Sequence, residues 1–226
     1  GIDINMGCPV KKVISKGCGA ALMRDGETAQ AMVAAVAGAV KIPVSVKMRS
    51  GWDRSSMNAD CLATTLVERG AQCVIIHPRT RADMYKSTPR WEMLALIRQA
   101  VQVPVIASGD IRTARDLETL RALGADGFMI GRAAIGRPWI FRELTSGAPP
   151  ALSERRDLVL EHLDSLCTYM GEQKGVRYMR KFLSSYVKGL PGAPGFREAI
   201  GTIEDPRELK IFISEFFQAA AEEHTP

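Results

Sequence analysis

One cysteine stands where it could take part in chemistry, in the segment Asn5-Met6-Gly7-Cys8-Pro9 that follows an apolar run of strand type. A thiol between glycine and proline at the end of a strand has no packing rationale, so Cys8 is a candidate acid or nucleophile. Cys18 lies in a glycine-containing segment and is expected to be exposed. The other three are interpreted as small buried apolar residues: Cys61, Cys73 and Cys167.

Charged or titratable side chains end the next two apolar runs. Lys47 follows Val44-Ser45-Val46, and His77 follows Val74-Ile75-Ile76. A buried ammonium without a partner costs several kcal/mol, so Lys47 is expected to meet an anion or another acceptor. For His77, a satisfied core histidine and a ligand-binding histidine remain equally open.

Two glycine loops follow the last two apolar runs, Ser108-Gly109-Asp110 and Ile130-Gly131-Arg132. In α/β barrels, backbone N–H groups of the corresponding loops bind phosphate, and Arg132 adds a fixed cation. A plain turn is the alternative for either glycine alone. As a pair, the loops favour a phosphorylated ligand.

Five strands are predicted to position these residues, at 2–5, 44–47, 74–77, 105–108 and 127–130, with helices predicted between them at 26–40, 59–69, 91–101 and 114–123. An open doubly wound sheet has the same alternation, but its reactive residues gather at one switch point. Here every predicted strand ends in such residues, Arg49 and Arg79 included. The sequence therefore predicts an α/β fold, a partial TIM (β/α)8 barrel with about three further units expected before Gly1.

The pattern becomes wholly helical after Phe141, with a predicted linker at 146–150. Amphipathic helices are predicted around 152–170 and 176–186, followed by a break at 189–195. A last helix has Asp205 as its N-cap and Pro206 at its first position. We expect two domains, a catalytic barrel portion at 1–145 and a helical domain at 151–226.

The composition restricts the choice of partners. A formal charge of +5 and basic clusters at Lys11, Lys12, Lys16 and at Arg177, Arg180, Lys181, Lys188 fit a folded RNA. No apolar stretch is long enough for a membrane span. Five cysteines without a C-x-x-C pair indicate free thiols in a reducing compartment, and no disulfide framework or metal site. A monomer is expected.

These motifs resemble those of the tRNA-dihydrouridine synthases, above all the bacterial B-type branch. The resemblance runs through the segments 3–9, 21–25, 46–52, 77–80, 109–111, 130–132 and 136–139, and it extends into the helical region at 180–181 and 188–191. The family usually has Asn at the position of Ser108 and often Gly at that of Pro78. Its N-terminal strands have no counterpart here.

The resemblance implies a cytoplasmic enzyme that uses FMN and NADPH to reduce a uridine flipped out of tRNA, with hydride passing to C6. It makes Cys8 the acid that protonates C5. The implied cofactor-binding residues are Lys47, His77, Ser108, Gly109, Asp110, Gly131 and Arg132. The implied substrate-binding residues are Asn5, Arg49, Arg79, Lys11, Lys12, Arg177, Arg180 and Lys181.

Two alternatives remain open. The first is another FMN barrel, of the dihydroorotate dehydrogenase type, which shares the phosphate loops but is disfavoured by the basic helical domain. The second is an inactive, truncated RNA-binding remnant.

Overall fold

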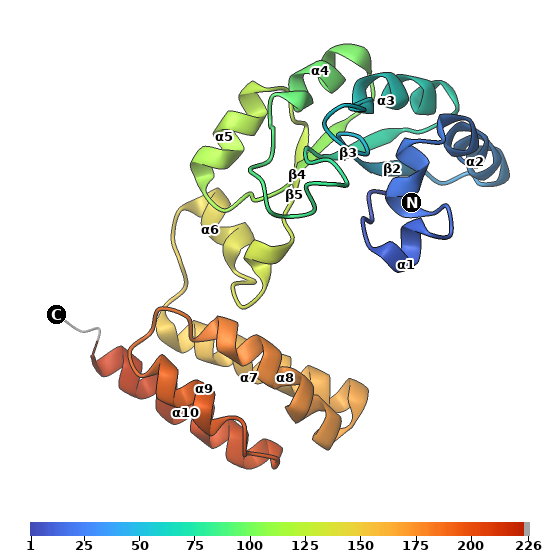
Figure 1. Ribbon diagram of the computed structural model, residues 1–226. Helices are drawn as coiled ribbons and strands as arrows, with labels where there is room; N and C mark the ends of the chain where they lie inside the picture. Colours follow the sequence, from blue (N-terminus) through green and yellow to red (C-terminus); the bar gives the residue numbers. More distant parts are fainter. Residues whose placement is uncertain (224–226) are drawn as a thin grey trace. The chain divides into compact units, whose positions relative to one another are not determined.

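The computed structural model describes residues 1–223, and the chain divides into two compact units, with the division between Gly131 and Arg132 (Figure 1). The sequence predicted a catalytic domain up to residue 145 and a helical domain from residue 151. This assignment of functions to the two parts of the chain stays a prediction.

The first unit is built on a five-stranded parallel sheet in the order β1-β2-β3-β4-β5. Its strands are β1 (Ile2–Met6), β2 (Val44–Arg49), β3 (Cys73–His77), β4 (Val105–Ser108) and β5 (Gly127–Met129). Each strand pairs with the next one in the chain, and the order never reverses as it does in a doubly wound sheet. The unit is therefore a partial (β/α)8 barrel, as predicted.

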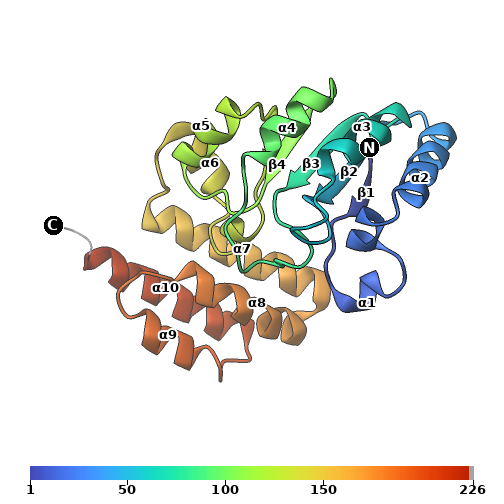
Figure 2. The same cartoon turned by 45° about the horizontal axis from the view of Figure 1, so that its top comes forward.

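Helices cover one face of this sheet, as Figures 1 and 2 show. They are α2 (Gly26–Ala39), α3 (Ala59–Glu68), α4 (Met93–Ala100) and α5 (Ala114–Ala122). Two short elements between β1 and α2 were not predicted from the sequence, α1 (Lys11–Ile14) and the 3-10 helix η1 (Gly19–Met23). Alternate residues of β2 are fully buried in the core: Val44, Val46 and Met48.

The opposite face of the sheet carries the polar side chains. Asn5 is in register with Lys47, and Arg49 is in register with His77. Residues in register point to the same face, and alternate residues of one strand share a face. These four side chains therefore lie on one face, near the carboxyl ends of the strands.

The second unit is helical, with η2 (Arg132–Ala134), α6 (Ile140–Ser146), α7 (Leu152–Met170), α8 (Glu172–Tyr186), α9 (Ala193–Ala199) and α10 (Pro206–Glu222). The core is built from α7, α8 and α10, and it includes Val159, Leu163, Met179, Leu183, Ile213 and Phe217. The side chain of Asp205 accepts hydrogen bonds from the N–H groups of Arg207 and Glu208, which confirms the predicted N-cap. No helix of the described chain combines the length and the hydropathy that a membrane span requires.

Besides the short 3-10 helix η2, two α-helices of this unit were not predicted. One is α9, which begins at Ala193, so the break predicted at 189–195 ends earlier than expected. Pro194 lies in the first turn of α9, where the backbone N–H that proline lacks would have no partner within the helix. The other is α6, which precedes the predicted linker.

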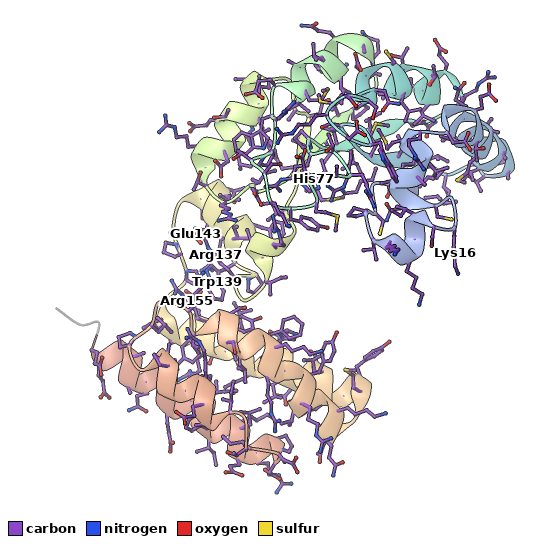
Figure 3. The ribbon with its side chains drawn as sticks, viewed as in Figure 1. Lys16, His77, Arg137, Trp139, Glu143 and Arg155 are labelled. Carbon is purple, nitrogen blue, oxygen red and sulfur yellow. The ribbon has the colours of Figure 1, made fainter. Side chains whose placement is uncertain are left out.

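An ion pair and a cation–π contact organise the chain around α6 and the start of α7 (Figure 3). Nε and Nη2 of Arg137 donate to the carboxylate of Glu143 at 2.9 and 2.6 Å. The guanidinium of Arg155 lies 5.1 Å from the centre of the Trp139 ring, and its Nε donates to the carbonyl of Pro150 at 3.1 Å. The segment predicted as a linker is therefore anchored within the unit.

A glycine sets how closely α7 and α8 approach. A Cβ atom at Gly175 would lie 2.7 Å from the backbone N and Cα of Cys167, whereas one at Gly195 in α9 would meet nothing within 4 Å. We expect Gly175→Ala to lower the free energy of unfolding by about 1 to 3 kcal/mol through overpacking. The matched change Gly195→Ala should be neutral or slightly stabilising, since alanine is the better helix former. Chemical denaturation measures both, and equal stabilities would contradict the close crossing.

Candidate active site

Cys8 lies in the loop after β1, and three neighbours fix the backbone of that loop. Oδ1 of Asn5 accepts hydrogen bonds from the N–H groups of Gly7 at 2.9 Å and Cys8 at 3.1 Å. Nε of Arg49 donates to the carbonyl of Gly7 at 2.8 Å. The N–H of Ala20 donates to the carbonyl of Cys8 at 3.0 Å. The half-buried thiol therefore stands on a rigid loop.

Close packing of η1 supports this loop. Gly19 has a φ of +60°, and a Cβ there would lie 2.8 Å from the carbonyl oxygen of Cys8. Only glycine allows the two segments to approach so closely. Cys18, next to it, is exposed as predicted.

The interpretation of the remaining cysteines needs correction. Cys61 is exposed, although it was predicted to be buried, and Cys73 and Cys167 are half-buried. Helical periodicity places Cys61 on α3 but on its solvent side, next to the buried Leu62 and Ala63.

The guanidinium of Arg49 connects two loops. The residue is only 1% exposed, and its Nη1 donates to the carbonyls of Thr80 at 2.9 Å and Met84 at 2.8 Å, in the loop after β3. Burial lowers the pKa of this guanidinium, whereas interactions with Tyr85 and Cys8 raise it. Arg49 therefore links the Cys8 loop to the loop after β3, and its predicted contact with substrate stays a prediction.

His77 is buried among cations at the end of β3. Nη1 of Arg79 lies 3.4 Å from Nε2 of the imidazole. Burial and then the charges of Arg49, Lys47 and Arg79 lower the pKa of His77 to about 3. Burial also lowers the pKa of Lys47, with a further contribution from Arg49. At neutral pH the imidazole is therefore uncharged.

The loop after β4 packs directly on this imidazole. A Cβ at Gly109, whose φ is +107°, would lie 2.7 Å from Cδ2 of His77. The carboxylate of Asp110 accepts a hydrogen bond from Nη2 of the buried Arg79 at 2.5 Å. The neighbouring Ser108 is buried at the end of β4. The sequence predicts a phosphate loop at these residues, and in the structure Gly109 packs on His77 while Asp110 pairs with Arg79.

The loop after β5 differs from the loop after β4. A Cβ at Gly131 would meet nothing within 4 Å, so its backbone is open to a ligand. Arg132, the next residue, begins η2 in the second unit. The phosphate-binding roles of Gly131 and Arg132 stay predictions.

Tyr85 was not among the site residues predicted from the sequence. Its ring is half exposed, its centre lies 6.0 Å from that of His77, and the guanidinium of Arg49 is 5.2 Å from it. Tyr85 also lines a pocket of about 540 Å³ with residues that include Arg79, Trp91 and Asp110. The one available signal was an aromatic side chain within a largely polar loop.

The predicted RNA-binding side chains differ in what they contact. Lys11 and Lys12 are exposed, and Figure 3 shows the nearby Lys16 extending away from the first unit. Arg177, Arg180 and Lys181 have partners in the protein, and Nζ of the exposed Lys181 lies 4.4 Å from the centre of the Tyr178 ring. Arg177 pairs with Glu204 at 3.2 Å, and Nη2 of Arg180 donates to the carbonyl of Ile203 at 2.7 Å. Their contacts with RNA stay predictions.

Within residues 1–223, no group of three or more His, Cys, Asp and Glu side chains is arranged to hold a metal ion. The polar groups of the site are instead a thiol, an imidazole and several cations.

Comparison with known proteins gives consistent results along the chain. The model of the dihydrouridine synthase (Dus) family matches residues 1–222. tRNA-dihydrouridine synthase B of Pseudomonas syringae is 44% identical over 224 residues, covering 96% of this chain and 66% of the relative. The same enzyme of Pseudomonas aeruginosa is 42% identical, with coverages of 96% and 68%. A probable tRNA-dihydrouridine synthase of Rickettsia typhi is 39% identical, with coverages of 96% and 69%.

The chain thus spans about two thirds of the length of these relatives. Among solved structures, a mandelate oxidase mutant with (S)-mandelic acid matches with a TM-score of 0.32 and 14% identity, over 85% of this chain and 71% of that one.

The low pKa of His77 predicts a pH dependence of stability. Above the ordinary histidine pKa of 6.5 the imidazole is neutral in both the folded and the unfolded state. Between pH 6.5 and about 3 only the unfolded state binds the proton, so stability falls as the pH falls. The slope from this one group reaches about 1.4 kcal/mol per pH unit. Denaturant unfolding of the wild type and of His77→Gln isolates it, and parallel pH profiles would refute the assignment.

The links made by Arg49 predict how its replacement affects Cys8. In Arg49→Lys all donors sit on one nitrogen and cannot replace the separate positions of Nε and Nη1, so we expect a loss of stability of at least about 2 kcal/mol. The freed loop should also let iodoacetamide alkylate Cys8 faster. Peptide mapping measures this rate, with the exposed Cys18 as an internal reference. An unchanged ratio of the two alkylation rates would show that Arg49 does not hold the Cys8 loop.

Proposed function

Because the chain belongs to the dihydrouridine synthase family, we propose that the protein reduces uridine in tRNA to 5,6-dihydrouridine, with FMN as its cofactor and NADPH as its reductant. One observation carries the proposal: Cys8 stands on a rigid loop at the same end of the sheet as a buried group of cations. A positioned acid next to an anion-binding surface is what the reduction of a uracil ring by a flavin requires.

The polar side chains on the face of the sheet opposite the helices suit a flavin. Lys47, Arg49 and Arg79 bring positive charge around the neutral His77, and these charges add to the effect of burial on its pKa. These positive charges repel one another, and an electron-rich ring edge would reduce the repulsion. We therefore assign Lys47 and His77 to the flavin ring. The open backbone of Gly131 favours a phosphate site at that loop, with Arg132 and the Ser108–Asp110 loop as the further phosphate-binding residues. FMN, when bound, supplies the hydride.

The proton comes from the chain itself. Cys8 transfers its thiol proton to C5 of the uracil as hydride reaches C6, so that the C5–C6 double bond becomes single and a thiolate remains. Solvent then returns a proton to the sulfur. Asn5, Arg49 and Arg79 hold the uracil in this scheme. A base inside a tRNA can reach them only after it leaves its stack.

Phosphate contacts hold the RNA around that base. We assign Lys11 and Lys12 to one contact region, and Arg177, Arg180 and Lys181 to another. Of the second set, Lys181 is the sharpest test, because Arg180 also bonds the carbonyl of Ile203 and its loss would disturb the fold.

Replacing the proposed acid separates the two half-reactions. In the full-length protein, Cys8→Ala should still let NADPH bleach the flavin at a near-normal rate, because that step needs no thiol. Single-turnover formation of dihydrouridine should fall roughly 100- to 10,000-fold, the usual contribution of a general acid. Stopped-flow absorbance follows the first step, and mass spectrometry of the tRNA follows the second.

Cys18→Ala is the matched control, since Cys18 is the exposed thiol of the same region, and it should change neither step by much. Full dihydrouridine formation in Cys8→Ala would refute the assigned acid. Loss of flavin reduction in that variant would make Cys8 a flavin-binding or structural residue.

A further inference from the structure

Two arginines lie over one tryptophan ring in the first unit. The guanidinium carbon of Arg24 is 3.9 Å from the centre of the Trp52 ring, and that of Arg81 is 4.5 Å from it. The two positive charges therefore lie within about one screening length, roughly 8 to 10 Å at physiological ionic strength. Stacking on the ring offsets part of their repulsion, by about 0.5 to 1 kcal/mol for each exposed contact.

The three residues come from three loops at the catalytic end of the sheet. Arg24 follows η1, Trp52 follows β2 and Arg81 follows β3. These connections leave the carboxyl ends of neighbouring parallel strands, as the Cys8 loop does. The Arg24–Trp52–Arg81 stack therefore lies at the same edge of the sheet as Cys8.

Backbone hydrogen bonds hold these loops together. The N–H of Arg81 donates to the carbonyl of Gly51 at 2.9 Å, and the N–H of Ala82 donates to the carbonyl of Trp52 at 2.9 Å. Nδ2 of Asn58 donates to the carbonyl of Met23 at 2.8 Å. The stack is therefore a preorganised arrangement of two guanidinium groups.

Neither guanidinium has an acceptor within the described chain, residues 1–223. Arg24 and Arg81 form no side-chain hydrogen bond or ion pair there, and Nε of Arg81 is buried without a partner. The nearby carboxylates are already engaged: Asp25 with the N–H of Thr28, Asp53 with Ser55 and Ser56, and Asp83 with Thr80 and Arg54. Two fixed cations with unused planar donors match a phosphate group.

We propose that Arg24 and Arg81, held against Trp52, form a binding site for one backbone phosphate of the RNA whose uridine enters the active site. This inference rests on the proposed function and adds a specific anchor at the mouth of the sheet. An anion beside these guanidinium groups offsets their mutual repulsion and accepts hydrogen bonds from donors that the protein leaves unused. Because the contact is to the backbone, it fixes the register of the RNA without reading its sequence.

The test compares Arg24→Gln, Arg81→Gln and the double variant with Arg54→Gln in the full-length, flavin-loaded protein. Arg54 is the matched control, because it lies in the same region, is 63% exposed and is already paired with Asp83 at 3.2 Å. tRNA affinity is measured over a series of KCl concentrations. The double variant should bind about tenfold more weakly, and the slope of log affinity against log salt should fall by about one. Arg54→Gln should change both much less.

A conservative variant and a stability measurement separate binding from folding. Arg24→Lys should keep the salt slope, because the charge stays, while losing part of the affinity with the planar donors. Thermal unfolding of every variant shows whether the loops remain attached. If the double variant unfolds at a lower temperature but binds tRNA like Arg54→Gln, the stack only fastens loops and the inference is wrong. If the unmodified protein fails to bind tRNA, the proposed function falls together with this inference.

Discussion

The position of Cys8 depends on a single buried guanidinium. Arg49 ends β2, and its donors reach the carbonyl of Gly7 on one side and those of Thr80 and Met84 on the other. A charged group can be buried this deeply only if its donors are used, and carbonyl oxygens use them without adding a counter-charge. The arrangement therefore fixes two loops and still leaves the site positively charged.

Burial, together with this positive charge, explains the state of His77. Its depressed pKa arises from burial and from Arg49, Lys47 and Arg79, while Asp110 opposes the shift. The carboxylate of Asp110 bonds to Arg79, so one acidic group faces several cations. A neutral imidazole beside fixed cations can form a directed hydrogen bond with a ligand without adding to the charge. The excess of positive charge favours the binding of anionic ligands at this end of the sheet.

The sequence was sufficient for the strands and for the long helices. Runs such as Val74-Ile75-Ile76 are buried on both faces of a parallel sheet, so their composition identifies them, and the register then places Lys47 and His77 on one face. The short elements α1, η1, α6 and α9 have too few turns to show a periodic pattern. They form because tertiary contacts hold them, as Gly19 does against Cys8.

The sequence could not predict which groups each side chain contacts. Arg24, Arg49 and Arg81 all lie between a predicted strand and the next predicted helix, and they look alike in sequence. Nevertheless Arg49 uses its Nε and Nη1 on backbone carbonyls, whereas Arg24 and Arg81 share one ring and have no acceptor in the described chain. The difference depends on which loops meet in space, and loops of irregular conformation carry no periodicity that would reveal it. An arginine whose donors are satisfied stabilises the fold. An arginine whose donors are fixed in place but unused can bind an anion more tightly, because the free-energy cost of desolvating and ordering its side chain has already been met by folding.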